Sequence, residues 1–229
     1  MEDIDELDES VKAMAGSAWG RLRITAPMSL GSEVVVPALL QFAKSYPNIE
    51  IDLSVSDRIV NLVDEGFDAA VRVGTPGSAS MISRRLWEAR VVLVAAPQYL
   101  ETAKIPTHPN DLKELDCVLD TNFGDPYHWR FKEPKTHEPI TVPVSGRLSF
   151  SGAEACLAAA EKGFGVSRVP SFMAVRKIQD GSLRHLLADF EEAPYPVYAV
   201  YPPGRHQAIK LRVFVDFLVA HFSDSSRWP

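Results

Sequence analysis

The stretch GRLRITAPMSLGSEVVVPALLQFAKSYPNIEIDLSVSDRIVNLVDEGFDAAVRVG, residues 20–74, decides the fold of this chain. A β-rich run, Leu22–Ala26, leads into a helix with regularly spaced apolar residues, Leu30–Ser45, and then a second strand, Ile49–Val55. After a short second helix, Phe67–Val73 reads as a buried strand. This β-α-β-α-β order predicts an α/β fold with a parallel sheet, in which helices begin at the carboxyl ends of strands. Open sheets of this kind bind small ligands at that edge.

Two helices are expected within this stretch. The first, Leu30–Ser45, contains Pro37, which lacks a backbone N–H and should produce a local kink. The second, Arg58–Glu65, follows Asp57 as its cap and should end at Gly66. The apolar positions of the first helix are Val34, Leu39, Leu40, Phe42 and Ala43.

The bulk properties are those of a globular protein, with 229 residues, 46% of them hydrophobic and 24% charged. The net charge of −6 argues against the chain gripping nucleic acid by itself, because phosphate binding needs clustered Lys and Arg. No signal peptide is recognisable, and no run reaches the roughly 18 apolar residues that span a bilayer. We therefore expect a cytoplasmic location and no membrane contact. Cys117 and Cys156 are expected to be small core residues.

The remainder predicts a second lobe and a return to the first. Arg90–Ala96 is almost wholly apolar, which is typical of a strand buried on both faces. Ser151 and Glu154 form a capping box before an alanine-rich helix, and Pro170 should occupy the first position of the next helix. The other expected elements are strands at Cys117–Asp120, Val142–Phe150, Gly165–Val169 and Pro196–Tyr201, a loop or hairpin at Asn122–Pro139, and a last helix at about Gln207–Phe222.

A series of fragments, in this order and spacing, resembles the effector-binding domain of LysR-type transcriptional regulators. They are GRLRITAP, LLQFAKSYPNIEIDL, DRIVNLVDEGFDAAVRVG, SRRLWEARVVLVAAPQYL, THPNDLKELDCVLD, HWRF, EKGFGVSRVP, GSLRHLL and PVYAVYPPGRH. The resemblance implies two Rossmann-like lobes joined by two crossover strands, as in type II periplasmic binding proteins, with a small effector in the cleft between them. The implied divisions are 1–19 as the remnant of a linker helix, 20–94 with 195–223 as lobe I, 95–194 as lobe II, and 224–229 as a tail.

The resemblance also implies partners. These are a small-molecule effector, expected to be an organic anion, and further copies of the chain in a homodimer or homotetramer. DNA would be bound only through an N-terminal winged helix-turn-helix, which this sequence does not include. In the family, the first helix of one subunit packs antiparallel beside a second-lobe helix of another, which here would pair Glu33–Lys44 with Ala153–Lys162.

Lobe I supplies the first candidate effector contacts. Ser29, Leu30 and Ser32 stand at the start of the first helix, where free N–H groups and the helix dipole favour an anion. The serines would alternatively act only as caps. Ser56 follows the second strand. Arg72 lies in the third predicted strand, and Thr75 follows that strand. An arginine inside the apolar run DAAVRVG is unusual. It would be explained either by a position in the cleft or by an edge position from which the side chain reaches solvent.

Lobe II supplies the remaining candidates. Ser149, Phe150 and Ser151 close the long predicted strand and should face the cleft, although Phe150 would serve equally well in the core. Thr121, which follows another strand with Asn122, is a further candidate. Arg168 would offer positive charge to an anionic effector, and a salt bridge is its ordinary alternative.

Three function classes remain to be compared. Catalytic patterns such as Gly-x-Ser-x-Gly, a Walker loop or His-Glu-x-x-His are missing, so we expect no enzyme, no cofactor and no metal. A solute-binding protein of a transporter shares the two-lobe plan but would require export. A ligand-sensing regulatory domain is the function that the sequence favours.

Overall fold

The computed structural model describes residues 18–75, 80–204 and 208–223, so the predicted linker remnant up to Ser17 and the tail lie outside the described residues. The chain divides into two compact units. The first unit contains the described residues up to Glu88 and those from Tyr195 onward, and the second is Ala89–Pro194. The chain therefore passes between the units twice.

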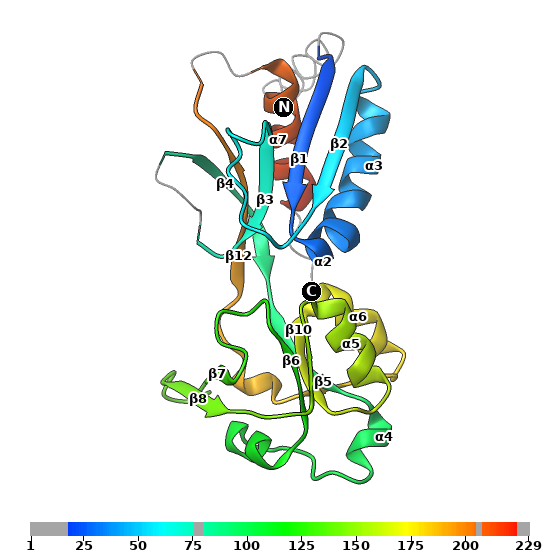
Figure 1. The fold of residues 1–229 in the computed structure, drawn as a ribbon, viewed down its shortest axis with the longest axis vertical. Helices are drawn as coiled ribbons and strands as arrows, with labels where there is room; N and C mark the ends of the chain where they lie inside the picture. Colours follow the sequence, from blue (N-terminus) through cyan, green and yellow to red (C-terminus); the bar gives the residue numbers. More distant parts are fainter. Residues whose placement is uncertain (1–17, 76–79, 205–207, 224–229) are drawn as a thin grey trace, which may run out of the picture. The chain divides into compact units, whose positions relative to one another are not determined.

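The first unit is built on a five-stranded mixed sheet with the order β2-β1-β3-β12-β4 (Figure 1). Strand β1 runs parallel to both β2 and β3, whereas β12 runs antiparallel to β3. The strand bounds are β1 Gly20–Ala26, β2 Ile49–Val55, β3 Ala69–Val73, β4 Ile82–Ala89 and β12 Tyr195–Tyr201. The parallel β1, β2 and β3 end at the same edge, as the sequence predicts.

A continuous helical segment follows β1, but its first turns are not uniform. It comprises α2 (Met28–Leu30), a π-helical stretch η1 (Gly31–Val35) and α3 (Val36–Ser45). The N–H of Val36 donates to the carbonyl of Gly31, five residues back. This wider turn lies immediately before Pro37. In a regular α-helix the proline ring would clash with the carbonyl group four residues earlier in the chain. The irregularity expected at Pro37 is thus a π-helical stretch.

The buried face of this helix packs on the sheet and on α7 (Ile209–Phe222). Phe42 is fully buried, and its ring centroid lies 5.5 Å from that of Phe214 in an edge-to-face contact. Of the other apolar positions of this helix, Val34 and Leu39 are buried. Leu40 is 63% exposed, and Ala43 is also exposed. Both lie on the side of the helix that faces away from the sheet.

The predicted second helix, Arg58–Glu65, does not form and was a wrong prediction. The segment is a series of turns before Gly66, which adopts a φ of 69°. The side chain of Asn61 accepts hydrogen bonds from the N–H groups of Val63 and Asp64, in competition with helical bonding. Ile59 is 94% exposed. The apolar residues of the segment are spaced as in an amphipathic helix, but they do not form one buried face.

The second unit has its own five-stranded sheet, with the order β11-β5-β10-β6-β9. Strand β10 runs parallel to β6 and antiparallel to β5, and β6 runs parallel to β9. The strand bounds are β5 Val91–Ala95, β6 Cys117–Asp120, β9 Leu148–Phe150, β10 Val166–Pro170 and β11 Arg184–Leu186. The helical elements are α4 Pro97–Leu100, η2 Pro109–Glu114, α5 Ala153–Glu161, α6 Ser171–Gln179 and η3 Ala188–Phe190.

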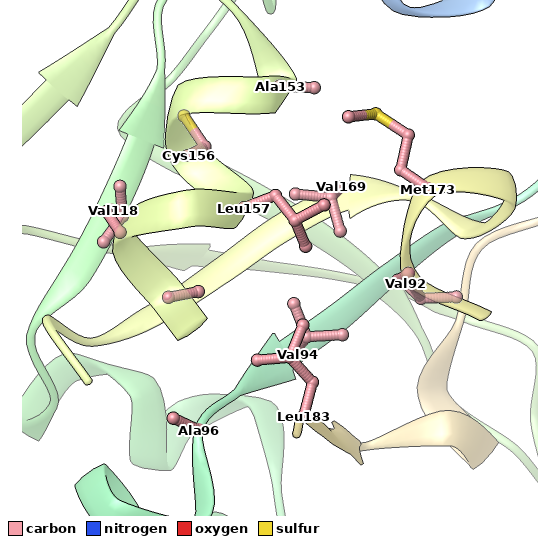
Figure 2. Packing of buried hydrophobic residues seen from close by; sticks show 13 residues of the cluster. Val92, Val94, Ala96, Val118, Ala153, Cys156, Leu157, Val169, Met173 and Leu183 are labelled. Atoms are coloured by element: carbon pink, nitrogen blue, oxygen red, sulfur yellow. The ribbon is translucent and has the colours of Figure 1, made fainter. Parts of the chain in front are cut away.

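Both faces of this second sheet are buried, which explains the unbroken apolar run of β5. Val92 and Val94 pack under α5 and α6 with Leu157 and Met173 (Figure 2). The alternate residue Leu93 belongs to a second cluster on the opposite face. Side chains of a strand alternate between faces, so a strand covered on both sides is mostly apolar.

Both cysteines are buried, as predicted, and both are free. Cys156 lies in the cluster beneath α5, and Cys117 lies in the cluster on the other face of the sheet. Burial raises the pKa of each thiol to about 12. Each side chain therefore stays a neutral thiol near pH 7 and acts as a small apolar group.

Three local predictions in the second unit need correction. The single strand predicted over Val142–Phe150 is two strands in different sheets, because β8 (Pro139–Pro143) pairs with β7 (His128–Lys132) while β9 pairs with β6. A hairpin was allowed for residues 122–139, and β7 lies within that range, but β8 begins at its last residue and continues to Pro143. The Ser151 capping box is absent, since α5 has Gly152 at its cap with no side-chain bond. Pro170 likewise caps α6 and is not its first residue.

The close approach of Gly146 to Cys117 generates a stability prediction. A Cβ at Gly146 would lie 1.7 Å from the backbone oxygen of Cys117, so Gly146→Ala must displace backbone. We expect the free energy of unfolding, measured by urea denaturation, to fall by about 2 kcal/mol or more. The matched control is Gly124→Ala, where nothing lies within 4 Å, and its expected change is below about 0.5 kcal/mol. Equal losses of unfolding free energy in the two variants would contradict the claim that the segment between β8 and β9 needs glycine at position 146.

Candidate functional site

The carboxyl ends of β1 and β2 meet at the start of the long helical segment in the first unit. The N–H of Ser56 donates to the carbonyl of Ala26 at 2.9 Å, which joins the two strand ends. Gly31 sits so near β2 that an added Cβ would lie 2.4 Å from the Cγ1 atom of Val55. Glycine therefore allows the first helical turn to lie directly against the strand.

Asp57 caps this helix and not the segment that follows it in sequence. Its Oδ1 atom accepts a hydrogen bond from the N–H of Met28 at 2.9 Å. The prediction of a capping role was right, but the capped helix was wrong. An N–H group of the first turn has no acceptor within its own helix, so a carboxylate supplied from β2 satisfies it and complements the helix dipole.

Arg72 extends from β3 toward β1 at the same edge of the sheet. Its guanidinium lies 3.5 Å from the Oγ1 atom of Thr25 and 3.4 Å from the carbonyl of Val71, both at the limit of hydrogen bonding. Burial lowers the pKa of Arg72, and the negative charge of Asp57 opposes that shift. Among the described residues, no carboxylate forms an ion pair with Arg72. The side chain is a half-buried cation at the strand ends, not an arginine extended from a sheet edge into solvent.

The other predicted residues of the first unit differ in exposure. Ser29 is half-buried in the first turn, and Ser32 is exposed in the π-helical stretch. Leu30 is 1% exposed and belongs to the core, so its side chain is not presented to a ligand. Thr75 is exposed and follows Gly74, which has a φ of 88°. In sequence, Ser29 comes directly after Met28, and Thr75 comes after the end of β3.

The predicted residues of the second unit meet at the ends of β6 and β9. The N–H and hydroxyl of Thr121 both donate to the carbonyl of Phe150, at 2.8 and 3.1 Å. Phe150 is partly buried and packs against the cluster beneath α5, as its core alternative predicts. Ser149 precedes it on the alternate side of the strand and is exposed, as is Ser151. The two serines and Phe150 therefore differ in exposure, and Ser149 and Ser151 remain predicted effector contacts.

Arg168 takes part in a charged cluster within the second unit. It donates to Glu192 at 3.2 Å, and the other oxygen of Glu192 accepts from Arg130 at 2.9 Å. The guanidinium also lies over the rings of Phe123 and Trp129, with its carbon 5.3 and 6.0 Å from their centroids. The salt bridge proposed as its ordinary alternative is present. It is nearly buried, with the Arg168 side chain 11% exposed, and not a surface pair.

Sequence reasoning missed two buried polar residues at the strand ends. Thr25 is 1% exposed in β1 and lies beside the Arg72 guanidinium. Asp120 is 7% exposed at the end of β6, and its carboxylate accepts from the N–H of Asn122 at 2.9 Å. The sequence held a signal for both residues, because each is a polar residue at the last or next-to-last position of an otherwise apolar strand.

A separate cavity of about 370 Å³ lies in the second unit and contains none of the predicted site residues. Its lining includes Tyr99, Lys104, Asp111 and Asp116. Over the residues that the structure describes, no three His, Cys, Asp or Glu side chains are placed to hold a metal ion. Within the same residues, no helix combines the length and apolar character needed to cross a bilayer.

Comparison with known proteins agrees with the fold of both units. The family described as the LysR substrate binding domain matches residues 15–223. The HTH-type transcriptional regulator PtxR of Pseudomonas aeruginosa is 30% identical over 219 residues, which cover 96% of this chain and 70% of the relative. DmlR of Escherichia coli, also an HTH-type transcriptional regulator, is 29% identical and is covered over 72% of its length.

Solved structures of regulators give the same result. The full-length structure of the Vibrio cholerae virulence activator AphB aligns with a TM-score of 0.81 at 29% identity, covering 96% of this chain and 75% of that one. The regulatory domain of CrgA from Neisseria meningitidis aligns with a TM-score of 0.79 at 26% identity, covering 89% and 99%. The predicted α/β fold of two Rossmann-like lobes is confirmed. With the match extending over nearly the whole described sequence, the chain belongs to the LysR family as an effector-binding regulatory domain.

Proposed function

We propose that this regulatory domain binds the carboxylate of a small organic anion at the edge of the first sheet where β1, β2 and β3 end. The proposal rests on the surroundings of Arg72. This side chain is a half-buried cation whose hydrogen bonds are long and which has no carboxylate partner among the described residues. A charge removed from water is costly unless it is paired. An anionic ligand would supply that pairing and two short, charge-assisted hydrogen bonds.

The first helical turn would complete the carboxylate contacts. Ser29 offers a hydroxyl and an N–H at a position where helices have no internal acceptor. Ser32, Ser56 and Thr75 remain proposed contacts at the rim. In the second unit, Thr121, Ser149 and Ser151 remain proposals, whereas Phe150 and Arg168 are already engaged in the packing and ion pairing described above.

The effector would act by shifting the population of conformations or assemblies. A ligand shifts such an equilibrium only to the extent that it binds one state more tightly than the other. The contacts between effector and protein must therefore be stronger in one arrangement than in the other. Because the relatives are transcriptional regulators, we propose that the readout is DNA binding through a separate head domain in the cytoplasm, without enzymatic activity. The same relatives disfavour the alternative of a transporter solute-binding protein.

Association between copies is the second part of the proposal. On α3, the exposed Leu40 presents an apolar side chain on the face turned away from the sheet. On α5, Ala155 and Ala158 are exposed and three residues apart, so they lie on one side of the helix. We propose that α3 of one copy packs on α5 of another, as the sequence resemblance suggested.

The binding proposal predicts a specific loss in Arg72→Gln. In a thermal-shift screen of small carboxylates, a ligand at about a hundred times its dissociation constant should add roughly 2.7 kcal/mol of stability. For the best such ligand, calorimetry should show affinity about 10- to 100-fold weaker in Arg72→Gln, because a charged hydrogen-bond partner is lost.

The matched control is Arg212→Gln, which removes the same charge from an exposed position on α7 and should bind as the wild type does. A Ser29→Ala, Ser151→Ala double variant should also bind more weakly. Unchanged affinity in Arg72→Gln would place the anion elsewhere.

The assembly proposal predicts that Leu40→Glu dissociates the oligomer. Light scattering at tens of micromolar should report a dimer or tetramer for the wild type and a smaller species for Leu40→Glu, since a buried charge would face the partner. Ile105→Glu is the control, because Ile105 is exposed but lies outside α3 and α5. A monomeric wild type, or dissociation by both variants alike, would refute this interface.

A further inference from the structure

We propose that Asp57 restricts the anion site of the first unit to effectors that carry a single negative charge. This inference rests on the proposed function and adds the charge class of the ligand. It concerns Asp57, a carboxylate of the chain itself that lies among the groups expected to attract an anion.

The first step is the position of the Asp57 carboxylate. Its Oδ1 atom is 2.9 Å from the Met28 nitrogen, so the first N–H of the helix is already paired with an acid. The same carboxylate is close enough to Arg72 to act on its guanidinium electrostatically. One negative charge of the protein therefore bonds to the helix end and also acts electrostatically on the arginine.

The second step is the charge balance. Arg72 contributes one positive charge, and a helix N-terminus acts as roughly half a charge. Asp57 offsets one charge, so the three groups together retain about half a positive charge. A single carboxylate complements such a site, whereas a second carboxylate on the ligand would be repelled by Asp57.

The third step is the state of the neighbouring arginines. Arg58, directly after Asp57, donates to Glu65 at 2.5 and 3.0 Å. Arg23 bonds to Asp52 and to the carbonyls of Glu65 and Gly66. These two cations are held by groups of the protein, so neither offers an uncommitted partner to a second ligand carboxylate.

Calorimetry on length-matched acids tests the proposal. The probes are butyrate with succinate and benzoate with phthalate, at pH 8 and constant ionic strength, so that each diacid carries two charges. We expect the wild type to bind the monocarboxylate of a pair about tenfold more tightly than the diacid. In Asp57→Asn that ratio should fall about tenfold, because the repelling charge is lost while the amide oxygen can still accept from Met28.

Two further variants separate charge from structure. Asp57→Ser keeps a capping oxygen without the charge and should shift the ratio in the same direction as Asp57→Asn. Asp64→Asn removes an exposed acid from the same segment and should leave the ratio as in the wild type.

The outcomes distinguish this inference from the proposed function. A diacid bound as tightly as its monoacid by the wild type, or a ratio unchanged in both Asp57 variants, overturns the role of Asp57 alone. If no carboxylate binds, or binding is indifferent to Arg72→Gln, the anion site itself is refuted, and the inference falls with it.

Discussion

The contact between the end of β2 and the first turn of the long helix is the constraint on which the first unit depends. Asp57 accepts from Met28, and Gly31 allows the helix to lie against Val55. Together they hold the helix start at the carboxyl ends of the parallel strands. Arg72 reaches the same edge from β3. The arrangement of the candidate site is therefore a consequence of how one helix is seated on one strand.

The second unit uses its charges differently. Arg168 projects from the central strand β10 on the side of the β7-β8 hairpin, where Glu192 neutralises it and aromatic rings cover it. Arg168 already has a charged partner within the second unit, and removing either partner would leave a nearly buried charge unpaired. Two arginines in strands, Arg72 and Arg168, thus differ in role because of what packs around them, although both interrupt apolar runs.

Much of the fold was predictable because it depends on local patterns. The strands and the first helix of residues 20–74 and the apolar run of β5 follow from patterns that report burial directly. Errors arose where a local side-chain hydrogen bond or a tertiary contact overrode the predicted pattern. Asn61 competes with the helix expected after Asp57, and the strand expected through Phe150 is divided between two sheets. The sidedness of Ser149 and Phe150 likewise follows from pairing with β6.

Fold class, family and the strand ends at which polar residues gather can be read from the sequence, because periodicity and fragment order are properties of the chain. The helix that Asp57 caps, the lack of a carboxylate partner for Arg72 among the described residues, and the partner of Arg168 emerge only on folding. These facts concern residues distant in sequence. Pairing and desolvation of a charge depend on neighbours that folding brings together, and no local pattern records them.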